Sequence, residues 1–309
     1  MTIASIDIGT NTILLLIAEI DTQLHELKVL ENLQSIPRIG KGMIVNNPMP
    51  AENIERMMDV LTEYEKKIKK YNCEKILLTG TNALRIASNK SEIIAEVKNK
   101  FGYDLNIIPG NEEAQYSFIG AISGFRDNSK NLVIDIGGGS TEIIFGKGKE
   151  ILFSKSFHIG VVSGTEKFFL SDPPSVKQIQ NFIDYTRKIF SDLLEKDIDR
   201  TIAIAGTPTT LAAIKHKLKS YDEELIEGSS LTFEELNTFV AELSKLSYAE
   251  ILDKYYQIVK GREDILLAGT IILRELLKLL NIEEVKVSTK GIRYGAIIKW
   301  LNLNYNSQS

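Results

Sequence analysis

The strongest constraint on the fold of this chain is an internal repeat. Residues 6–12 read Ile-Asp-Ile-Gly-Thr-Asn-Thr, and residues 134–141 read Ile-Asp-Ile-Gly-Gly-Gly-Ser-Thr, which places their aspartates 128 residues apart. The pair Gly80-Thr81 recurs as Gly206-Thr207, at an offset of 126 residues. Two such matches, in the same order and at nearly the same offset, predict a duplicated domain with a join near residue 126.

The residues around the repeat alternate between strand and helix patterns. Apolar runs predict strands at 3–8 and 75–79, and apolar residues at helical spacing predict a helix from about 51 to 70. The expected fold is therefore α/β, with an N-terminal domain at 1–126 and a C-terminal domain at 127–309. Two similar halves facing each other would form a central cleft, and the last helix could pack back on the first domain.

Composition limits the kinds of partner and cofactor. The 309 residues include 37 basic and 41 acidic side chains, so the net charge of −4 removes the bulk electrostatic argument for binding nucleic acid or a membrane surface. A single cysteine, Cys73, excludes an internal disulfide, and three scattered histidines favour a hard cation held by carboxylates over zinc. The amino terminus reads as a strand rather than a signal peptide, and no apolar run is long enough to span a membrane, so we expect a cytoplasmic protein.

A run of glycines follows the aspartate of the second copy. Gly137, Gly138 and Gly139 would expose successive backbone N–H groups, and the next two residues, Ser140 and Thr141, add hydroxyl donors suited to phosphate oxygens. A second strand-like run follows, so the loop joins two strands, unlike the strand-to-helix loop of a dinucleotide fold. An ordinary hairpin explains three glycines equally well, but the aspartate, the hydroxyls and the duplication favour phosphate binding.

Other charged segments leave two interpretations open. Glu112 and Glu113 follow Pro109-Gly110, where acidic residues in a first helical turn also suit the helix dipole, and the sequence does not say which of them faces a ligand. Arg85 follows a Gly-Thr turn and could clamp a phosphate or lie on a helix surface. The loop 38–42 carries two cations, Arg38 and Lys41, close to two glycines, and these cations either contact an anion or are solvated.

These motifs together resemble one family. The chain resembles the exopolyphosphatase and guanosine pentaphosphate phosphatase (Ppx/GppA) family, in its short two-domain form. The segments that carry this resemblance have the order and approximate spacing of the family's motifs and are residues 6–12, 79–85, 109–114, 133–142 and 205–207. The resemblance covers nearly the whole chain and implies two duplicated ribonuclease-H-like domains of the actin-like superfamily. One departure is the segment 288–295, Ser-Thr-Lys-Gly-Ile-Arg-Tyr-Gly, where many members have Ser-Asp-Gly-Ala-Leu-Arg-Glu-Gly; its lysine and tyrosine could alter substrate preference.

The resemblance also implies roles for individual residues. The catalytic set consists of Glu113, which would activate the attacking water, with Glu142 and Arg85. The acids that would hold Mg²⁺ or Mn²⁺ are Asp7, Asp135 and Glu142. The residues that would bind the substrate phosphates are Asn11, Thr12, Gly137, Gly138, Gly139, Ser140, Gly206 and Thr207.

The implied activity is hydrolysis. We expect release of terminal orthophosphate from inorganic polyphosphate, from guanosine pentaphosphate, which would give the tetraphosphate, or from both, in a protein that could be a homodimer. Two alternatives remain: a small-molecule kinase of the same superfamily, and a non-catalytic sensor that binds an alarmone. The complete set of acids favours the hydrolase.

Overall fold

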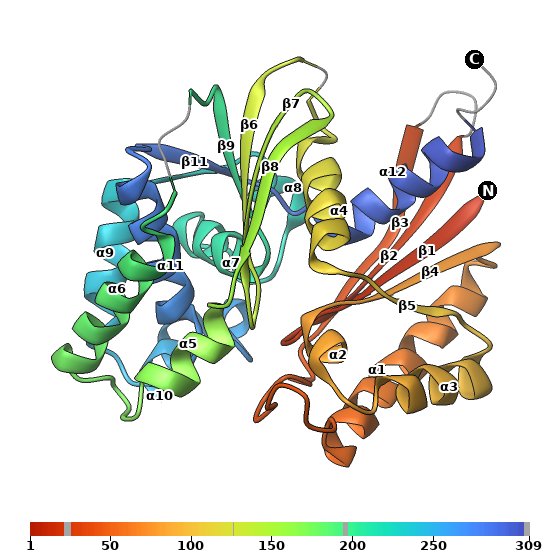
Figure 1. Cartoon of the computed structure of the whole chain (residues 1–309), viewed down its shortest axis with the longest axis horizontal. Helices are drawn as coiled ribbons and strands as arrows, with labels where there is room; N and C mark the ends of the chain where they lie inside the picture. Colours follow the sequence, from red (N-terminus) through yellow and green to blue (C-terminus); the bar gives the residue numbers. More distant parts are fainter. Residues whose placement is uncertain (22–25, 126, 194–196, 306–309) are drawn as a thin grey trace. The chain divides into compact units, whose positions relative to one another are not determined.

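A computed structural model describes residues 1–21, 26–125, 127–193 and 197–305 (Figure 1). The chain divides into two compact units. The first contains Met1–Ser123 together with the residues from Lys290 on, and the second is Gly124–Thr289. The expected C-terminal domain, 127–309, therefore differs from the second unit at its carboxyl end, because the last helix belongs to the first unit, a placement that the sequence left open.

The first unit is built on a mixed sheet with strand order β3-β2-β1-β4-β5. Its strands are β1 (Thr2–Ile8), β2 (Ile13–Asp21), β3 (Glu26–Ser35), β4 (Lys75–Gly80) and β5 (Leu105–Ile107). The first three form an antiparallel meander, and β4 and β5 continue the sheet parallel to β1. The helices are α1 (Ala51–Lys70), α2 (Asn82–Ile86), α3 (Lys90–Phe101), α4 (Gly110–Ile122) and α12 (Ile292–Tyr305).

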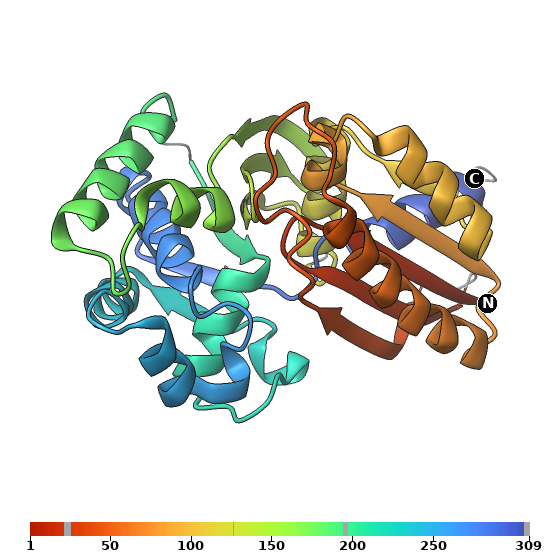
Figure 2. The ribbon, with the colours of Figure 1, turned by 90° about the horizontal axis from the view of Figure 1, so that it is seen from below.

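Both faces of this sheet are buried because apolar residues occupy both sides of its central strands. Ile6 and Leu15 pack with α1 and α3 on one face, which Figure 2 shows from the helix side. Ile3 and Leu16 pack with Ile297 of α12 on the other face. Near-continuous apolar runs in β1 and β2 are what a sheet covered on both faces requires.

The second unit repeats this topology. Its sheet has strand order β10-β11-β9-β6-β7-β8. The strands are β6 (Lys130–Ile136), β7 (Thr141–Lys147), β8 (Glu150–Phe157), β9 (Arg200–Ile204), β10 (Ser230–Thr232) and β11 (Glu284–Val287). The strands β6, β7 and β8 again form a meander, β9 and β11 continue it in parallel, and β10 adds an antiparallel edge.

The repetition extends to individual residue pairs. Asp7 lies opposite Leu14, and Asp135 lies opposite Glu142, both at an offset of 128 residues. The β-bulge between Ile17 and Ala18 recurs between Phe145 and Gly146, at the same offset. The predicted α/β class and the predicted duplication are thus confirmed.

One part of the sequence repeat, the recurring Gly-Thr pair, does not coincide with the structural repeat. Asp7 pairs with Thr79 across β1 and β4, whereas Asp135 pairs with Ile204 across β6 and β9. Sheet register therefore makes Ala205, not Gly206, the counterpart of Gly80. The second Gly-Thr pair lies one residue too far along the chain to be a strict equivalent of the first.

Helices α5 to α11 belong to the second unit. They are α5 (Val161–Phe168), α6 (Val176–Phe190), α7 (Gly206–Lys215), α8 (Glu223–Ile226), α9 (Phe233–Leu243), α10 (Tyr248–Tyr255) and α11 (Leu266–Leu279), with a short 3₁₀ turn at Tyr256–Ile258. Among the helices of the described residues, none is long and apolar enough to cross a membrane.

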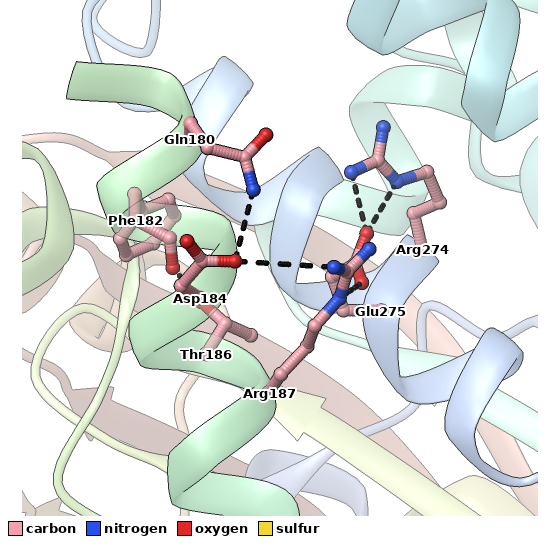
Figure 3. A network of polar contacts seen from close by, with 7 residues as sticks. All are labelled: Gln180, Phe182, Asp184, Thr186, Arg187, Arg274 and Glu275. Carbon is pink, nitrogen blue, oxygen red and sulfur yellow. Dashed lines mark hydrogen bonds and ion pairs between the residues drawn. The ribbon is translucent and has the colours of Figure 1, made fainter. Parts of the chain in front are cut away.

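A buried carboxylate joins α6 to α11 (Figure 3). Glu275 is only 3% exposed and accepts hydrogen bonds from Arg187 Nε at 2.7 Å and from Arg274 Nε at 2.8 Å. Asp184 lies 3.9 Å from Arg187 and accepts a hydrogen bond from Gln180. A buried carboxylate requires such compensation, so this network fixes how the two helices pack.

Candidate active site

The predicted site residues divide between the two units. The first unit holds Asp7, Asn11, Thr12, Arg85 and Glu113, and the second holds Asp135, Gly137, Gly138, Gly139, Ser140, Glu142, Gly206 and Thr207. Within each unit these residues gather at the ends of β1 and β4, or of β6 and β9, because parallel strands end at the same edge of a sheet.

Each hairpin loop is closed by the same hydrogen bond. Gly9 N donates to Thr12 O at 3.0 Å in the first loop, and Gly137 N donates to Ser140 O at 2.9 Å in the second. Both contacts join the ends of a four-residue turn that directly follows the strand bearing the aspartate. The loops are therefore equivalent in backbone structure although their sequences differ.

The second loop is supported by α5. Gly137 O accepts a hydrogen bond from Val161 N at 3.0 Å, and Gly138 O accepts one from Val162 N at 2.8 Å. In a planar trans peptide the C=O and the following N–H point in opposite directions. The N–H groups of Gly138 and Gly139 consequently both point away from α5, which suits an anion-binding backbone.

Close packing makes this support possible. A Cβ atom at Gly160, immediately before α5, would lie 2.5 Å from the carbonyl oxygens of both Gly137 and Gly138. Only glycine leaves room there for the helix to approach the loop. Thr141 at the other end of the loop donates from Oγ1 to Ile159 O at 2.6 Å, so the predicted hydroxyl donor is used in holding this segment.

The first loop is supported by a non-helical segment. Thr10 O accepts a hydrogen bond from Gly40 N at 2.8 Å, and Asn11 O accepts one from Arg38 N at 3.1 Å. The same peptide geometry turns the N–H groups of Asn11 and Thr12 away from this segment. The segment around residues 38–40 thus does for the first loop what α5 does for the second.

Two carboxylates face each other beside the second loop. Asp135 and Glu142 are directly opposite on β6 and β7 and are 7% and 2% exposed. Ser156 Oγ donates to Glu142 Oε1 at 2.6 Å from the neighbouring strand. Like charges directly opposite on a sheet repel, so the pair suits a site where a cation compensates them.

The structure distinguishes the two adjacent glutamates. Helix α4 begins at Gly110 with Pro109 in the N-cap position, so both acids lie in the first turn. Glu113 is 6% exposed and binds Arg85, whose Nη1 donates to Glu113 Oε2 at 2.7 Å and to Ile108 O at 3.0 Å. The Arg85 guanidinium therefore orients the Glu113 carboxylate and compensates its charge.

Glu112 has a different environment. Its Oε1 accepts a hydrogen bond from Tyr116 OH at 2.8 Å and lies 3.2 Å from Lys299 Nζ, which also stands over the Tyr116 ring. Burial, together with the hydrogen bond to Glu112, raises the pKa of Tyr116. Glu112 joins α4 to α12, and Glu113 is the acid associated with the candidate site.

Gly206 and Thr207 open helix α7. Arg262 donates from Nη1 to Gly206 O at 2.9 Å and to Thr210 Oγ1 at 2.8 Å, and its burial lowers its pKa to about 10. The Thr207 side chain packs against Gly269 of α11, where a Cβ would clash with its hydroxyl. Sequence analysis missed Arg262, because nothing in its local spacing indicates that it reaches a turn 56 residues away.

The unusual segment 288–295 is largely structural. Tyr294 is buried with Ile3 and Leu16 beneath the first sheet. Arg293 donates to Leu15 O at 3.1 Å and to Asn32 Oδ1, which anchors α12 to β2 and β3. The helix begins at Ile292, so Arg293 and Tyr294 lie in its first turn and serve packing within the first unit.

Each unit contains a hairpin loop in which buried acids lie beside backbone N–H groups that point away from the loop's support. Such an arrangement is typical of enzymes that transfer phosphoryl groups. The chain belongs to the Ppx/GppA phosphatase family, which matches residues 16–304. Both the predicted family and the prediction of an enzyme of the phosphatase class are confirmed.

Individual relatives agree with this assignment. A bifunctional 3-dehydroquinate synthase/phosphatase of Fusobacterium nucleatum is 34% identical over 96% of the chain, which spans 46% of that protein. Exopolyphosphatase 2 of Mycobacterium tuberculosis is 30% identical over 95% of the chain and 96% of its own length. The crystal structure of the Aquifex aeolicus Ppx/GppA family member, 29% identical, superposes with a TM-score of 0.86 over 100% of this chain and 99% of that one.

Proposed function

We propose that the chain hydrolyses the terminal phosphoanhydride bond of inorganic polyphosphate or of guanosine pentaphosphate and releases orthophosphate. The observation that carries this proposal is the Arg85–Glu113 pair, because it fixes a buried carboxylate at the start of a helix. A carboxylate held in this way can orient a water molecule and accept its proton as that water attacks phosphorus. The relatives named as exopolyphosphatase and phosphatase support the substrate class.

The two hairpin loops would bind the phosphates. Outward N–H groups of Asn11 and Thr12 in the first unit, and of Gly138 and Gly139 in the second, are suitable donors for phosphate oxygens. Within the described part of the chain, the Arg85 side chain makes both of its hydrogen bonds through Nη1. Its Nε and Nη2 donors would form a fork for a phosphate. Gly206 and Thr207 would contribute backbone at the start of α7.

Ppx/GppA phosphatases are generally metal-dependent, and the acids of the second hairpin fit a divalent cation. Among the described residues no group of three or more His, Cys, Asp or Glu side chains is arranged so that it could hold a metal ion by itself. Mg²⁺ needs no such cage, since it commonly binds one or two carboxylates along with substrate phosphates. Asp135 and Glu142 would hold Mg²⁺ or Mn²⁺, which when bound would neutralise charge on the transferring phosphoryl group. Asp7 would be the acid on the other hairpin.

Replacing Glu113 by Gln tests the mechanism. Loss of a general base should reduce turnover by about 100- to 10,000-fold, while phosphate binding is kept. The matched control is Glu112→Gln, one residue earlier in the same helical turn, which should retain most activity because Glu112 contacts Tyr116 and Lys299. Orthophosphate release is measured with long polyphosphate, tripolyphosphate, guanosine pentaphosphate and ATP, each with Mg²⁺.

The outcomes separate the alternatives. Wild-type turnover by Glu113→Gln would show that another group activates water. Tight nucleotide binding without turnover by the unmodified chain would favour a sensor. Consumption of ATP without orthophosphate release would favour a kinase.

A further inference from the structure

The structure assigns a positioning role to two residues of α1 that no sequence motif indicates. We propose that Asn53 and Arg56 hold the first phosphate loop in its binding conformation, acting through the segment 37–41. This inference rests on the proposed function, because it concerns how substrate phosphates are bound. Hydrogen bonds join α1 to the segment, and others join the segment to the loop.

Asn53 is an anomaly on its helix. The other buried residues of α1 are mostly apolar, whereas Asn53 is 0% exposed and carries two amide protons that must be satisfied. Its Nδ2 donates to Ile39 O at 2.7 Å and to Lys41 O at 3.2 Å. A buried amide with both donors used on one loop is placed to determine that loop's conformation.

Arg56, one turn further along α1, holds the other end of the segment. Its Nε donates to Pro37 O at 2.8 Å, and its Nη2 donates to Asn53 Oδ1 at 2.6 Å and to Arg38 O at 3.4 Å. The two side chains therefore act as one unit. Together they bind four backbone carbonyls, those of residues 37, 38, 39 and 41.

Binding these carbonyls to α1 sets the direction of the segment's N–H groups. Arg38 N and Gly40 N donate to the carbonyls of Asn11 and Thr10, which turns the N–H groups of Asn11 and Thr12 outward. Gly40 lies so close that a Cβ there would clash with Thr10. The chain of contacts from α1 to the phosphate-facing N–H groups is thus continuous.

Backbone strain in the segment supports the same conclusion. Arg38 has φ of +53°, in the left-handed region that residues other than glycine rarely adopt. Gly160, which lies equally far beyond the corresponding strand of the second unit, is extended, with φ of −141°, so the left-handed backbone is particular to the first support. A strained residue persists only when its surroundings fix it, and Arg56 supplies two hydrogen bonds at this point.

Substitution of the two residues should weaken phosphate binding more than it slows chemistry. For Asn53→Ala and Arg56→Ala we expect the KM for tripolyphosphate to rise about tenfold, with kcat within about twofold, because the loop contacts substrate and transition state alike. Arg56→Lys should recover part of the affinity. Lys66→Gln is the matched control, since Lys66 is an exposed residue of the same helix that pairs with Glu63.

The measurements distinguish positioning from simple stabilisation. A purely structural role would lower the melting temperature and leave the KM and the dissociation constant for tripolyphosphate unchanged well below that temperature, which would overturn the inference. Should Asn53→Ala not fold, the half-exposed Arg56 still provides the test.

Calorimetry that measures tripolyphosphate binding distinguishes a failure of this inference from a failure of the proposed function. If the unmodified chain binds tripolyphosphate but releases orthophosphate from none of the four substrates, the hydrolase proposal fails, while weaker binding by the variants still supports the positioning role. If Asn53→Ala and Arg56→Ala bind tripolyphosphate as tightly as the unmodified chain, the positioning role fails and the hydrolase proposal stands.

Discussion

The two hairpins share a backbone but differ at the residue opposite their aspartate. Strand register, the closing hydrogen bond and the β-bulge all coincide. Asp7 nevertheless faces the half-buried Leu14, whereas Asp135 faces the buried Glu142. Duplication has preserved the geometry and allowed the chemistry to diverge, so that only the second hairpin presents a pair of carboxylates.

The segments that hold the two hairpin loops in place differ as well. The second loop rests on α5, whose first N–H groups bind the loop carbonyls directly. The first loop rests on a short segment that is itself held by two side chains of α1. A helix N-terminus provides these donors through its own backbone. The first copy, which has a non-helical segment at this place, needs Asn53 and Arg56 instead.

The largest expected effect comes from making the second hairpin resemble the first. Glu142→Leu removes one of the two facing acids, so we expect loss of Mg²⁺ binding and at least about a 100-fold fall in orthophosphate release. Calorimetry with Mg²⁺ and phosphate-release kinetics measure the two effects. Because Ser156 also contacts Glu142, Ser156→Ala is the control and should cost far less. If Glu142→Leu keeps the Mg²⁺ requirement of the unmodified chain, the cation does not bind at this hairpin.

Much of this architecture can be predicted from the sequence because the repeat carries it. A few matching residues reveal the period of 128 residues, and the near-continuous apolar runs of β1 and β2 indicate a sheet that is buried on both faces. Helix α1 spans Ala51–Lys70, where its apolar spacing predicts it. The resemblance to the Ppx/GppA family adds the candidate acids.

Contacts between distant segments could not be predicted in the same way. Nothing local to Arg56 or Arg262 indicates that it binds backbone carbonyls 18 or 56 residues away. Sequence alone also leaves Glu112 and Glu113 equivalent, because both suit a first helical turn. The distinction arises only when α12 brings Lys299 to one of them and the turn after β4 brings Arg85 to the other.

A smaller effect is expected from the reverse change. Leu14→Glu would place a second carboxylate opposite Asp7, and the repulsion should lower the free energy of unfolding by about 0.5–1 kcal/mol at neutral pH. The pKa of the new Glu would be raised in the folded state, so the penalty should disappear as the pH falls through that raised pKa. Added Mg²⁺ should stabilise this variant more than the unmodified chain.

Leu14→Gln is the matched control for this change, because it has the same length without the charge. Urea titrations of the two variants at several pH values measure the difference. If Leu14→Glu and Leu14→Gln are equally stable at every pH, repulsion between facing acids is not what distinguishes the hairpins.

The smallest effect concerns one position on the strand that runs parallel to the aspartate-bearing strand. This position directly follows the residue that pairs with Asp7 in the first copy, or with Asp135 in the second. The first copy has Gly80 there, and the second has Ala205 with φ of +74° and ψ of −166°, a region almost restricted to glycine. Ala205→Gly should relieve this strain and, after the entropic cost of glycine, raise the free energy of unfolding by about 0.5 kcal/mol. Ala203→Gly, in regular strand β9, is the control and should destabilise the chain by about 0.5–1 kcal/mol. Chemical denaturation gives both values.

Stability changes of opposite sign in the two variants would show that the second copy maintains a strained turn next to Gly206. Equal losses of stability would show that its backbone is relaxed there.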